Sequence, residues 1–71
     1  MPKFSERLKE LRKERKLTQN AMAELCGIKP RTYQDYEYDK SYPMVPGLIF
    51  LADFFNVSTD YLLGRTDKRE L

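Results

Sequence analysis

The feature of this sequence that most restricts its fold is a three-residue connection between two segments with helical spacing. Thr18 is a favourable N-cap for the first segment, over residues 19–26, whose apolar side chains share one face. Gly27 follows directly, where the end of a helix favours a residue with positive φ. Pro30 suits the first turn of the second segment, over residues 30–38, because its missing N–H would have no partner there. The spacing predicts two short helices that meet across a tight turn.

Three further helices are expected around this pair. An amphipathic helix over about residues 4–16 precedes it, although Ser5 could instead cap a later start. After a loop that contains two prolines, a nearly apolar helix covers about residues 46–55. A last short helix follows and is stopped by Gly64. The chain is therefore predicted to be all-α.

Length and composition describe one small folded domain over residues 1–71. The chain is 41% hydrophobic and 34% charged, which is typical of a folded chain rather than a disordered one. We expect a core over residues 4–64 and a charged tail over residues 65–71 that frays. No apolar run approaches the roughly 20 residues of a membrane span, and the first residues lack the apolar stretch of a signal peptide.

The cysteine and histidine content excludes several kinds of site. Cys26 is the single cysteine and there is no histidine, so a zinc site with nitrogen and sulfur ligands is excluded. An internal disulfide is impossible, which makes the cytoplasm the expected compartment. The sequence also lacks a glycine-rich phosphate loop, and its carboxylates are spread over helix surfaces. We therefore expect no catalysis, no metal and no cofactor, and no site for a small-molecule effector is evident.

The positive charge is concentrated in the first part of the chain. The net charge is only +2, but residues 1–40 carry ten Lys or Arg against seven Asp or Glu. Residues 41–71 carry three against four. This distribution has two readings: a solvated helix face, or a basic edge that faces phosphates.

The two helices joined at Gly27 have the geometry of a helix-turn-helix. Ala23 is small where the helices must approach, and Ile28 places an apolar side chain beneath the turn. The second helix then projects outward, with its N-terminus free to enter a groove about 12 Å wide.

Several short motifs share one gapless spacing along the chain: Arg7-Leu-Lys-Glu-Leu-Arg, Leu17-Thr-Gln, Ala23-Glu-Leu-Cys-Gly-Ile, Tyr36-Glu37, Pro43, Leu51-Ala52, Asn56-Val-Ser and Asp60-Tyr-Leu-Leu-Gly64. Each motif is weak alone, but their joint spacing over residues 5–64 resembles the phage-repressor (Cro/CI, XRE-type) helix-turn-helix family. The resemblance implies a five-helix, lambda-repressor-like DNA-binding domain. Members of this family usually bind operator DNA as a two-fold dimer.

The resemblance also implies DNA contacts in and around the helix-turn-helix. Gln19 matches a glutamine that meets a phosphate and braces the recognition helix; the alternative is an exposed polar residue beside a cap. Arg31 could pair with guanine and Gln34 with adenine, unless these residues are only the solvent face of the helix. The other DNA-facing positions are Lys29, Pro30, Thr32 and Asp35. Tyr38 and Lys40 follow, and they either donate hydrogen bonds to phosphates or are exposed loop residues without a contact to DNA. Pro30 and Asp35 are the weakest of these candidates, since one lacks an N–H and the other repels phosphate.

Two further groups of residues have implied roles outside the reading face, which is the side of the second helix of the helix-turn-helix that faces DNA. Arg12 and Glu37 match a pair that forms a salt bridge between the first and third helices of the family. Phe50 stands where the family often has a polar residue, with Phe54 one turn above it. We interpret Phe50 and Phe54, together with Tyr61, either as a dimer interface or as an ordinary extension of the core.

These features predict sequence-specific binding of double-stranded DNA by a small transcriptional regulator, with residues 30–38 in the major groove. A homodimer, a palindromic operator and a repressor are expected, although an activator remains open. The alternative is a protein–protein module, such as an antitoxin or adaptor that keeps the fold with weak DNA affinity. It is favoured by the equal numbers of cations and carboxylates around the recognition helix: Lys29, Arg31 and Lys40 against Asp35, Glu37 and Asp39.

Overall fold

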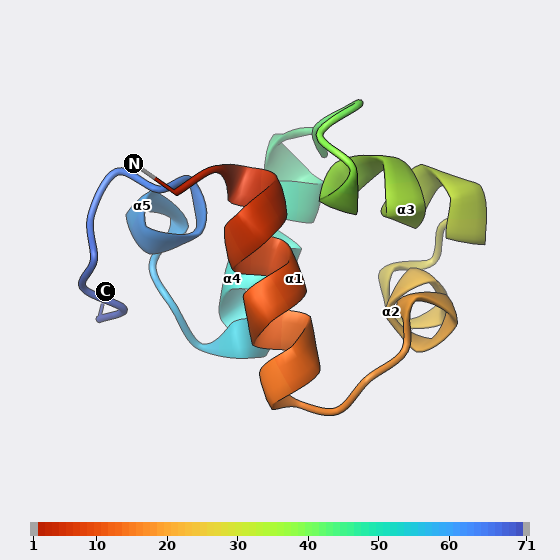
Figure 1. The fold of residues 1–71 in the computed structure, drawn as a ribbon, viewed down its shortest axis with the longest axis horizontal. Helices are drawn as coiled ribbons and strands as arrows, with labels where there is room; N and C mark the ends of the chain where they lie inside the picture. Colours follow the sequence, from red (N-terminus) through yellow and green to blue (C-terminus); the bar gives the residue numbers. More distant parts are fainter. Residues whose placement is uncertain (1, 71) are drawn as a thin grey trace.

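The computed structural model describes residues 2–70, which form five helices and no strand (Figure 1). The helices are α1 (Phe4–Glu14), α2 (Gln19–Cys26), α3 (Pro30–Glu37), α4 (Val45–Phe55) and α5 (Thr59–Leu62). In Figure 1, α1 crosses the middle of the molecule, with α2 and α3 on one side and α5 with the tail on the other. The predicted all-α class and the five helices are confirmed. No helix among residues 2–70 is long and apolar enough to cross a membrane.

Local side-chain and backbone preferences explain where α2 begins and ends. The Thr18 hydroxyl accepts a hydrogen bond from the Ala21 N–H at 3.0 Å, so it satisfies one of the free donors at the helix start. Gly27 has φ +69°, which ends the helix in the left-handed region. Both features follow the sequence prediction, because each depends only on neighbouring residues.

The start of α1 at Phe4 agrees with the prediction, whereas the end of α1, the end of α3 at Glu37 and the start of α4 each differ slightly from it. Lys3 rather than Ser5 precedes α1, and its backbone N–H donates to Glu6 Oε1 at 2.9 Å. Ser5 is buried within the first turn. The helix ends two residues earlier than expected, because Lys16 adopts φ +56°. Further along the chain, α4 starts at Val45 instead of residue 46.

The core is formed by one cluster of side chains contributed by all five helices. Tyr33 is its largest fully buried member and comes from the middle of α3. Its burial shows that the inner side of α3 packs into this core. The buried apolar residues are Phe4, Leu8, Leu11, Met22, Ala23, Tyr33, Leu51, Ala52, Phe55, Val57, Tyr61 and Leu62.

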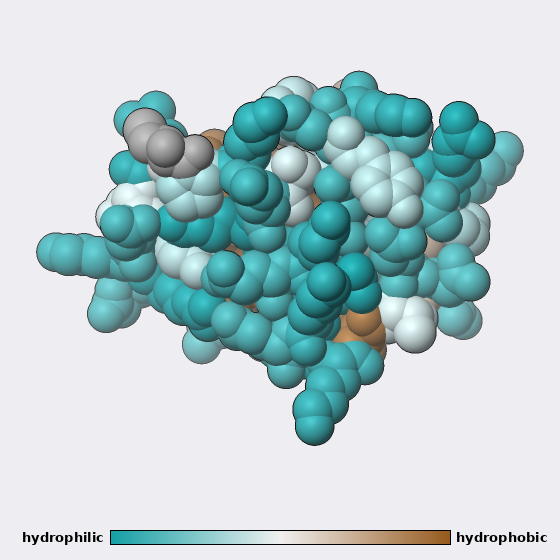
Figure 2. Space-filling model, viewed as in Figure 1, coloured by the Kyte–Doolittle hydropathy of each residue, from teal (hydrophilic) through white to brown (hydrophobic). Residues whose placement is uncertain are grey.

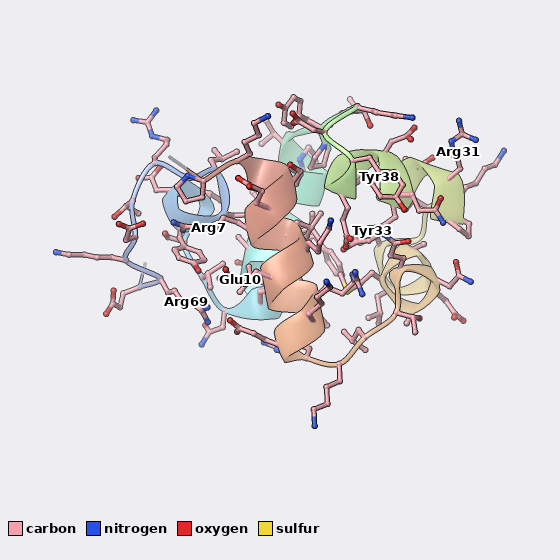
Figure 3. The ribbon with its side chains drawn as sticks, viewed as in Figure 1. Arg7, Glu10, Arg31, Tyr33, Tyr38 and Arg69 are labelled. Carbon is pink, nitrogen blue, oxygen red and sulfur yellow. The ribbon has the colours of Figure 1, made fainter. Side chains whose placement is uncertain are left out.

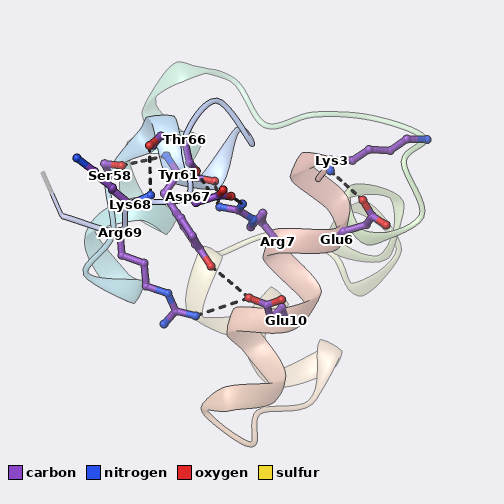
Figure 4. A network of polar contacts seen from close by, with 10 residues as sticks. All are labelled: Lys3, Glu6, Arg7, Glu10, Ser58, Tyr61, Thr66, Asp67, Lys68 and Arg69. Atoms are coloured by element: carbon purple, nitrogen blue, oxygen red, sulfur yellow. Dashed lines mark hydrogen bonds and ion pairs between the residues drawn. The ribbon is translucent and has the colours of Figure 1, made fainter. Parts of the chain in front are cut away.

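Residues 65–70 of the charged tail lie against the fold through side-chain contacts that its composition does not predict; Leu71 lies outside the described residues. Arg7 makes the first of these contacts, and its side chain is only 6% exposed. Its guanidinium donates to the carbonyls of Tyr61 at 2.9 Å and Thr66 at 3.1 Å, and to Asp67 Oδ1 at 2.8 Å. Figure 4 shows these groups converging between α1 and the tail. We call Arg7 with residues 65–70 the tail clasp.

Arg69 completes the tail clasp at its far end. Its guanidinium makes two hydrogen bonds to the Glu14 carboxylate, at 2.6 and 3.0 Å. Its carbonyl accepts the Ser58 N–H at 2.8 Å, next to the start of α5. The tail is therefore tied to both α1 and α5 by polar groups that a purely compositional reading treats as solvated.

Of the two readings of Tyr61, a dimer interface or an extension of the core, its burial favours the core, because its side chain is used inside the fold. Tyr61 is 5% exposed, and Arg7 lies 3.9 Å from its ring centroid. Arg69 lies near the same ring at 5.2 Å, and the hydroxyl donates to Glu10 Oε1 at 3.2 Å. Tyr61 therefore forms part of the packing between α1, α5 and the tail (Figure 4).

Candidate nucleic-acid interface

The turn between α2 and α3 directs α3 out of the core. Ile28 is half-buried against the core, and its N–H donates to the Ala23 carbonyl at 3.0 Å across Gly27. Ala23 itself is 1% exposed, so the two helices approach closely at this point. Pro30 begins α3 and is exposed together with Lys29. The N-terminus of α3 is therefore free of neighbouring elements that would block its approach to a groove.

One side of α3 is buried in the molecule and the other side faces outward. Tyr33 and Glu37, four residues apart, face the interior and are 0% and 4% exposed. Figure 3 shows Tyr33 beneath the helix, while Arg31 and Tyr38 extend to the surface. The outward-facing residues are Lys29, Pro30, Arg31 and Tyr38, which are exposed, and Thr32, Gln34 and Asp35, which are half-buried.

The Glu37 carboxylate anchors α3 to the rest of the molecule. Its side chain is fully buried and accepts hydrogen bonds from Arg12 Nε at 2.6 Å and Arg12 Nη2 at 3.1 Å. The Gln19 amide donates to it at 3.0 Å, and the Tyr33 hydroxyl supplies a fourth hydrogen bond. We call these four residues the Glu37 network. It joins α1, α2 and α3 through one charged group with all its partners in place.

The Glu37 network also sets the ionisation of its members. Burial alone would raise the pKa of Glu37, but the hydrogen bonds from Arg12, Tyr33 and Gln19 outweigh it and lower the pKa. Burial raises the pKa of the Tyr33 hydroxyl, and its hydrogen bond to Glu37 raises it further. The carboxylate is therefore charged and the phenol neutral across the usual range of pH, which preserves the network.

The sequence anticipated part of this network. The structure brings Arg12 and Glu37 together as an ion pair and places Gln19 in the bracing position. Sequence reasoning missed the hydroxyl of Tyr33 as a partner of Glu37. The signal that could have revealed it is the four-residue spacing of Tyr33 and Glu37, which puts the two side chains on one face of a helix.

The carboxylates near α3 are each held by a cation. Glu37 is paired inside the molecule, so it no longer counts toward the charge of the outer face. Asp35 lies 3.6 Å from Arg31. Lys29 and Lys40 are exposed and lie beyond ion-pair distance of every carboxylate in residues 2–70. The equal count of charges in the sequence therefore becomes a surface with unpaired cations, in a predominantly hydrophilic face (Figure 2).

A second surface feature is an apolar patch beside the loop that follows α3. Phe50 is 41% exposed, and its ring stacks on the half-buried ring of Phe54 with centroids 6.2 Å apart. A hollow of about 70 Å³ adjoins Phe50 and is lined by Cys26, Ile28, Tyr36, Pro43, Gly47 and Leu51. We call the exposed residues of this region the α4 patch; they are Met44, Val45, Ile49 and Phe50.

Comparison with known proteins identifies the domain. Residues 5–68 match the family described as "Helix-turn-helix domain". The chain is 42% identical over 64 residues to the uncharacterized HTH-type transcriptional regulator YobD of Bacillus subtilis, covering 90% of this chain and 57% of YobD. It is 37% identical over 70 residues to the transcriptional repressor RstR of the cryptic phage CTXphi in Vibrio cholerae, covering 96% of this chain and 62% of RstR.

A solved structure agrees with these relatives. The crystal structure of a transcriptional regulator from Listeria innocua superposes with a TM-score of 0.83 at 37% identity, covering 87% of this chain and 58% of that chain. This chain thus spans a little over half the length of the relatives that it matches. The helix-turn-helix geometry and these matches agree over nearly all of its residues, and the chain belongs to the helix-turn-helix family of the phage-repressor (Cro/CI, XRE) type.

Proposed function

We propose that this protein is a transcriptional regulator, most simply a repressor, that binds double-stranded DNA with α3 in the major groove. The observation that carries the proposal is the Glu37 network, which fixes α3 from its inner side and leaves the outer side free. A reading helix needs this division, because its base contacts must be presented on a rigid element. The repressor assignment draws on RstR, which is named a repressor.

The proposed base contacts lie on the exposed half of α3. The Arg31 side chain is 81% exposed, and its guanidinium suits the two acceptors of guanine in the major groove. Gln34, one turn further along, suits adenine, and Thr32 suits a thymine methyl or a phosphate. The proposed phosphate contacts are Gln19, Lys29, Tyr38 and Lys40. Pro30 and Asp35 border the same surface, but Asp35 serves best as the partner of Arg31.

We further propose that two copies bind a palindromic operator, joined through the α4 patch. The molecule measures 29 × 22 × 21 Å, so two copies side by side could place their recognition helices one helical turn of DNA apart, about 34 Å. The stacked pair of Phe50 and Phe54 provides apolar area on α4. We expect the dimer to act in the cytoplasm, where the single cysteine stays reduced.

The decisive experiment is selection of bound duplexes from a random pool, followed by gel shifts of the selected duplexes at two salt concentrations. The proposal predicts a palindromic consensus with half-sites about 10 base pairs apart and binding that weakens as salt rises. A variant with Arg31 and Gln34 both changed to Ala keeps the inner face of α3 and provides the folded control. It should bind without enrichment of any sequence.

The second candidate function is a protein–protein module, and the α4 patch with its adjoining hollow is the observation that favours it. The same experiment separates the two functions. Absence of salt-dependent binding to any duplex at micromolar protein would contradict the regulator and leave the module as the better explanation.

A further inference from the structure

A small cluster of polar groups lies at the end of α3, outside the reading face. Asp39 follows the helix and adopts φ +63°. One of its carboxylate oxygens lies 3.2 Å from Lys3 Nζ, and the other accepts a hydrogen bond from the Tyr42 hydroxyl at 3.2 Å. Residues from the start of α1, the end of α3 and the following loop are therefore brought together by one carboxylate.

The position of this cluster is set by packing rather than by the ion pair alone. The Tyr42 ring packs on Phe4 with centroids 5.8 Å apart, and Phe4 is a core residue. The backbone N–H of Lys3 is held by Glu6. The Lys3 backbone is therefore fixed close to the end of α3, and its side chain is 66% exposed to whatever approaches.

The backbone does not require a carboxylate at Asp39. Glycine and asparagine suit a left-handed residue after a helix at least as well. The backbone N–H groups of Lys40 and Ser41 are already accepted by the Asp35 carbonyl, at 2.9 and 3.3 Å. Within residues 2–70, the Asp39 carboxylate accepts hydrogen bonds only from the side chains of Lys3 and Tyr42. What it contributes is an anionic partner for two exposed donors.

We propose that Lys3 is a further phosphate contact of the DNA interface. In the free protein the Lys3 ammonium pairs with the Asp39 carboxylate, and a DNA phosphate replaces that carboxylate on binding. This inference rests on the proposed DNA binding. Exposed ion pairs contribute little to stability, so the exchange of one anionic oxygen for another is easy. The exposed residues Tyr38 and Lys40 lie on the same segment, which extends the phosphate-contact surface beyond α3. After the exchange, the Asp39 carboxylate stays near the phosphates and limits the affinity.

The first test compares two variants that lose one positive charge each. Lys3→Gln removes the proposed contact, whereas Lys68→Gln removes a cation in the tail, on the opposite side of the molecule from α3 (Figures 1 and 4). Binding of a short duplex of mixed sequence is followed by fluorescence anisotropy over a range of salt. For Lys3→Gln, the slope of log K against log salt should become shallower by about 0.9, the value for one lost phosphate contact. Lys68→Gln should leave the slope close to that of the wild type.

The second test compares two variants that each lose one carboxylate from an exposed ion pair. Asp39→Asn keeps a residue that tolerates the left-handed conformation, and it should bind the same duplex several-fold more tightly. Asp60→Asn breaks the pair with Arg65 at 3.4 Å, beside the tail, and should show a smaller gain. Adding Lys3→Gln to Asp39→Asn should remove part of the gain, because the released ammonium is then absent. Thermal unfolding checks that all variants are folded.

Each outcome decides one of the two proposals. If the wild type shows no salt-dependent binding, the proposed function fails. If the wild type binds but Lys3→Gln and Lys68→Gln change the slope equally, DNA binding stands and Lys3 is not a phosphate contact. An Asp39→Asn variant that binds no better than Asp60→Asn would contradict the role of the carboxylate.

Discussion

The hydroxyl of Tyr33 and the carboxylate of Glu37 lie one turn apart on the inner side of α3 and are joined by a hydrogen bond within the core. Arg12 and Gln19 donate to the same carboxylate from two other helices. The recognition helix is thus held by a charged group that has no access to solvent. Its stability depends on the protonation of that group.

Glu37→Gln should lower the free energy of unfolding by about 3 kcal/mol at neutral pH, because it leaves the Arg12 guanidinium with a neutral partner in a mostly buried site. Urea denaturation measures the loss. Glu24→Gln, on the exposed side of α2, is the control and should have little effect.

The difference in stability between the wild type and Glu37→Gln should depend on pH. The pKa of Glu37 is lower when folded than its ordinary value of 4.5, so its stabilising contribution is complete above that value and is lost as the pH falls below it. The difference in stability between wild type and Glu37→Gln should therefore shrink on acidification. A difference that stayed constant down to strongly acidic pH would show that Glu37 does not carry this charge.

Arg7→Leu should open the tail clasp. The substitution removes the guanidinium from the carbonyls of Tyr61 and Thr66, of which Tyr61 keeps the Gly64 N–H as a donor, and should cost about 2–3 kcal/mol. Hydrogen exchange gives a local readout, since the Ser58 N–H is bonded to the Arg69 carbonyl and should lose its protection. Asp67→Asn is the control, because that side chain is 95% exposed and its ion pair adds little. Equal exchange rates in wild type and Arg7→Leu would argue against the clasp.

Two glycines should respond differently to substitution by alanine. Gly27 has φ +69° and open space where a methyl group would lie, so Gly27→Ala should cost only the backbone strain, about 1 kcal/mol. Gly64 has φ +80°, and a methyl group there would overlap the carbonyl oxygen of Pro2. Gly64→Ala should be clearly the more destabilising of the two in thermal unfolding, and similar losses would disprove the close approach.

Arg31→Ala should weaken binding to a selected duplex by about 1–3 kcal/mol while changing binding to random duplex much less. Titrations of both duplexes at one salt concentration measure the two effects. Arg65→Ala, in the tail that follows α5, removes the same charge and is the control. A loss of equal size on both duplexes would make Arg31 a phosphate contact instead of a base contact.

Phe50→Glu should reduce the mass measured by light scattering, if the α4 patch joins two copies. The substitution places a charge in the apolar contact and disrupts it without touching the fully buried core. Leu63→Glu is a matched control, because Leu63 is 39% exposed, close to the 41% of Phe50, but lies after α5. An unchanged mass for Phe50→Glu would exclude the patch as the interface.

The sequence was informative where structure depends on neighbouring residues. Thr18 and Gly27 define the ends of α2 by local hydrogen bonding and backbone preference, and both were predicted. The contacts of the tail were not predicted, because they join Arg7 to Thr66 and Asp67. These two residues lie 59 and 60 positions further along the chain. The sequence left Tyr61 open between interface and core for the same reason, since the arginines that pack on its ring are distant in sequence. Composition cannot distinguish such buried charges from solvated ones.

The placement of all anchoring groups on one side of α3 has a consequence for how such a protein can change. Arg31, Thr32 and Gln34 contribute no hydrogen bond to the Glu37 network, so each can be replaced without removing a donor from it. What the helix recognises is therefore separable from what keeps it folded. In the proposed complex with DNA, new operator preferences can therefore arise by substitution at a few positions of α3 while the Glu37 network stays intact.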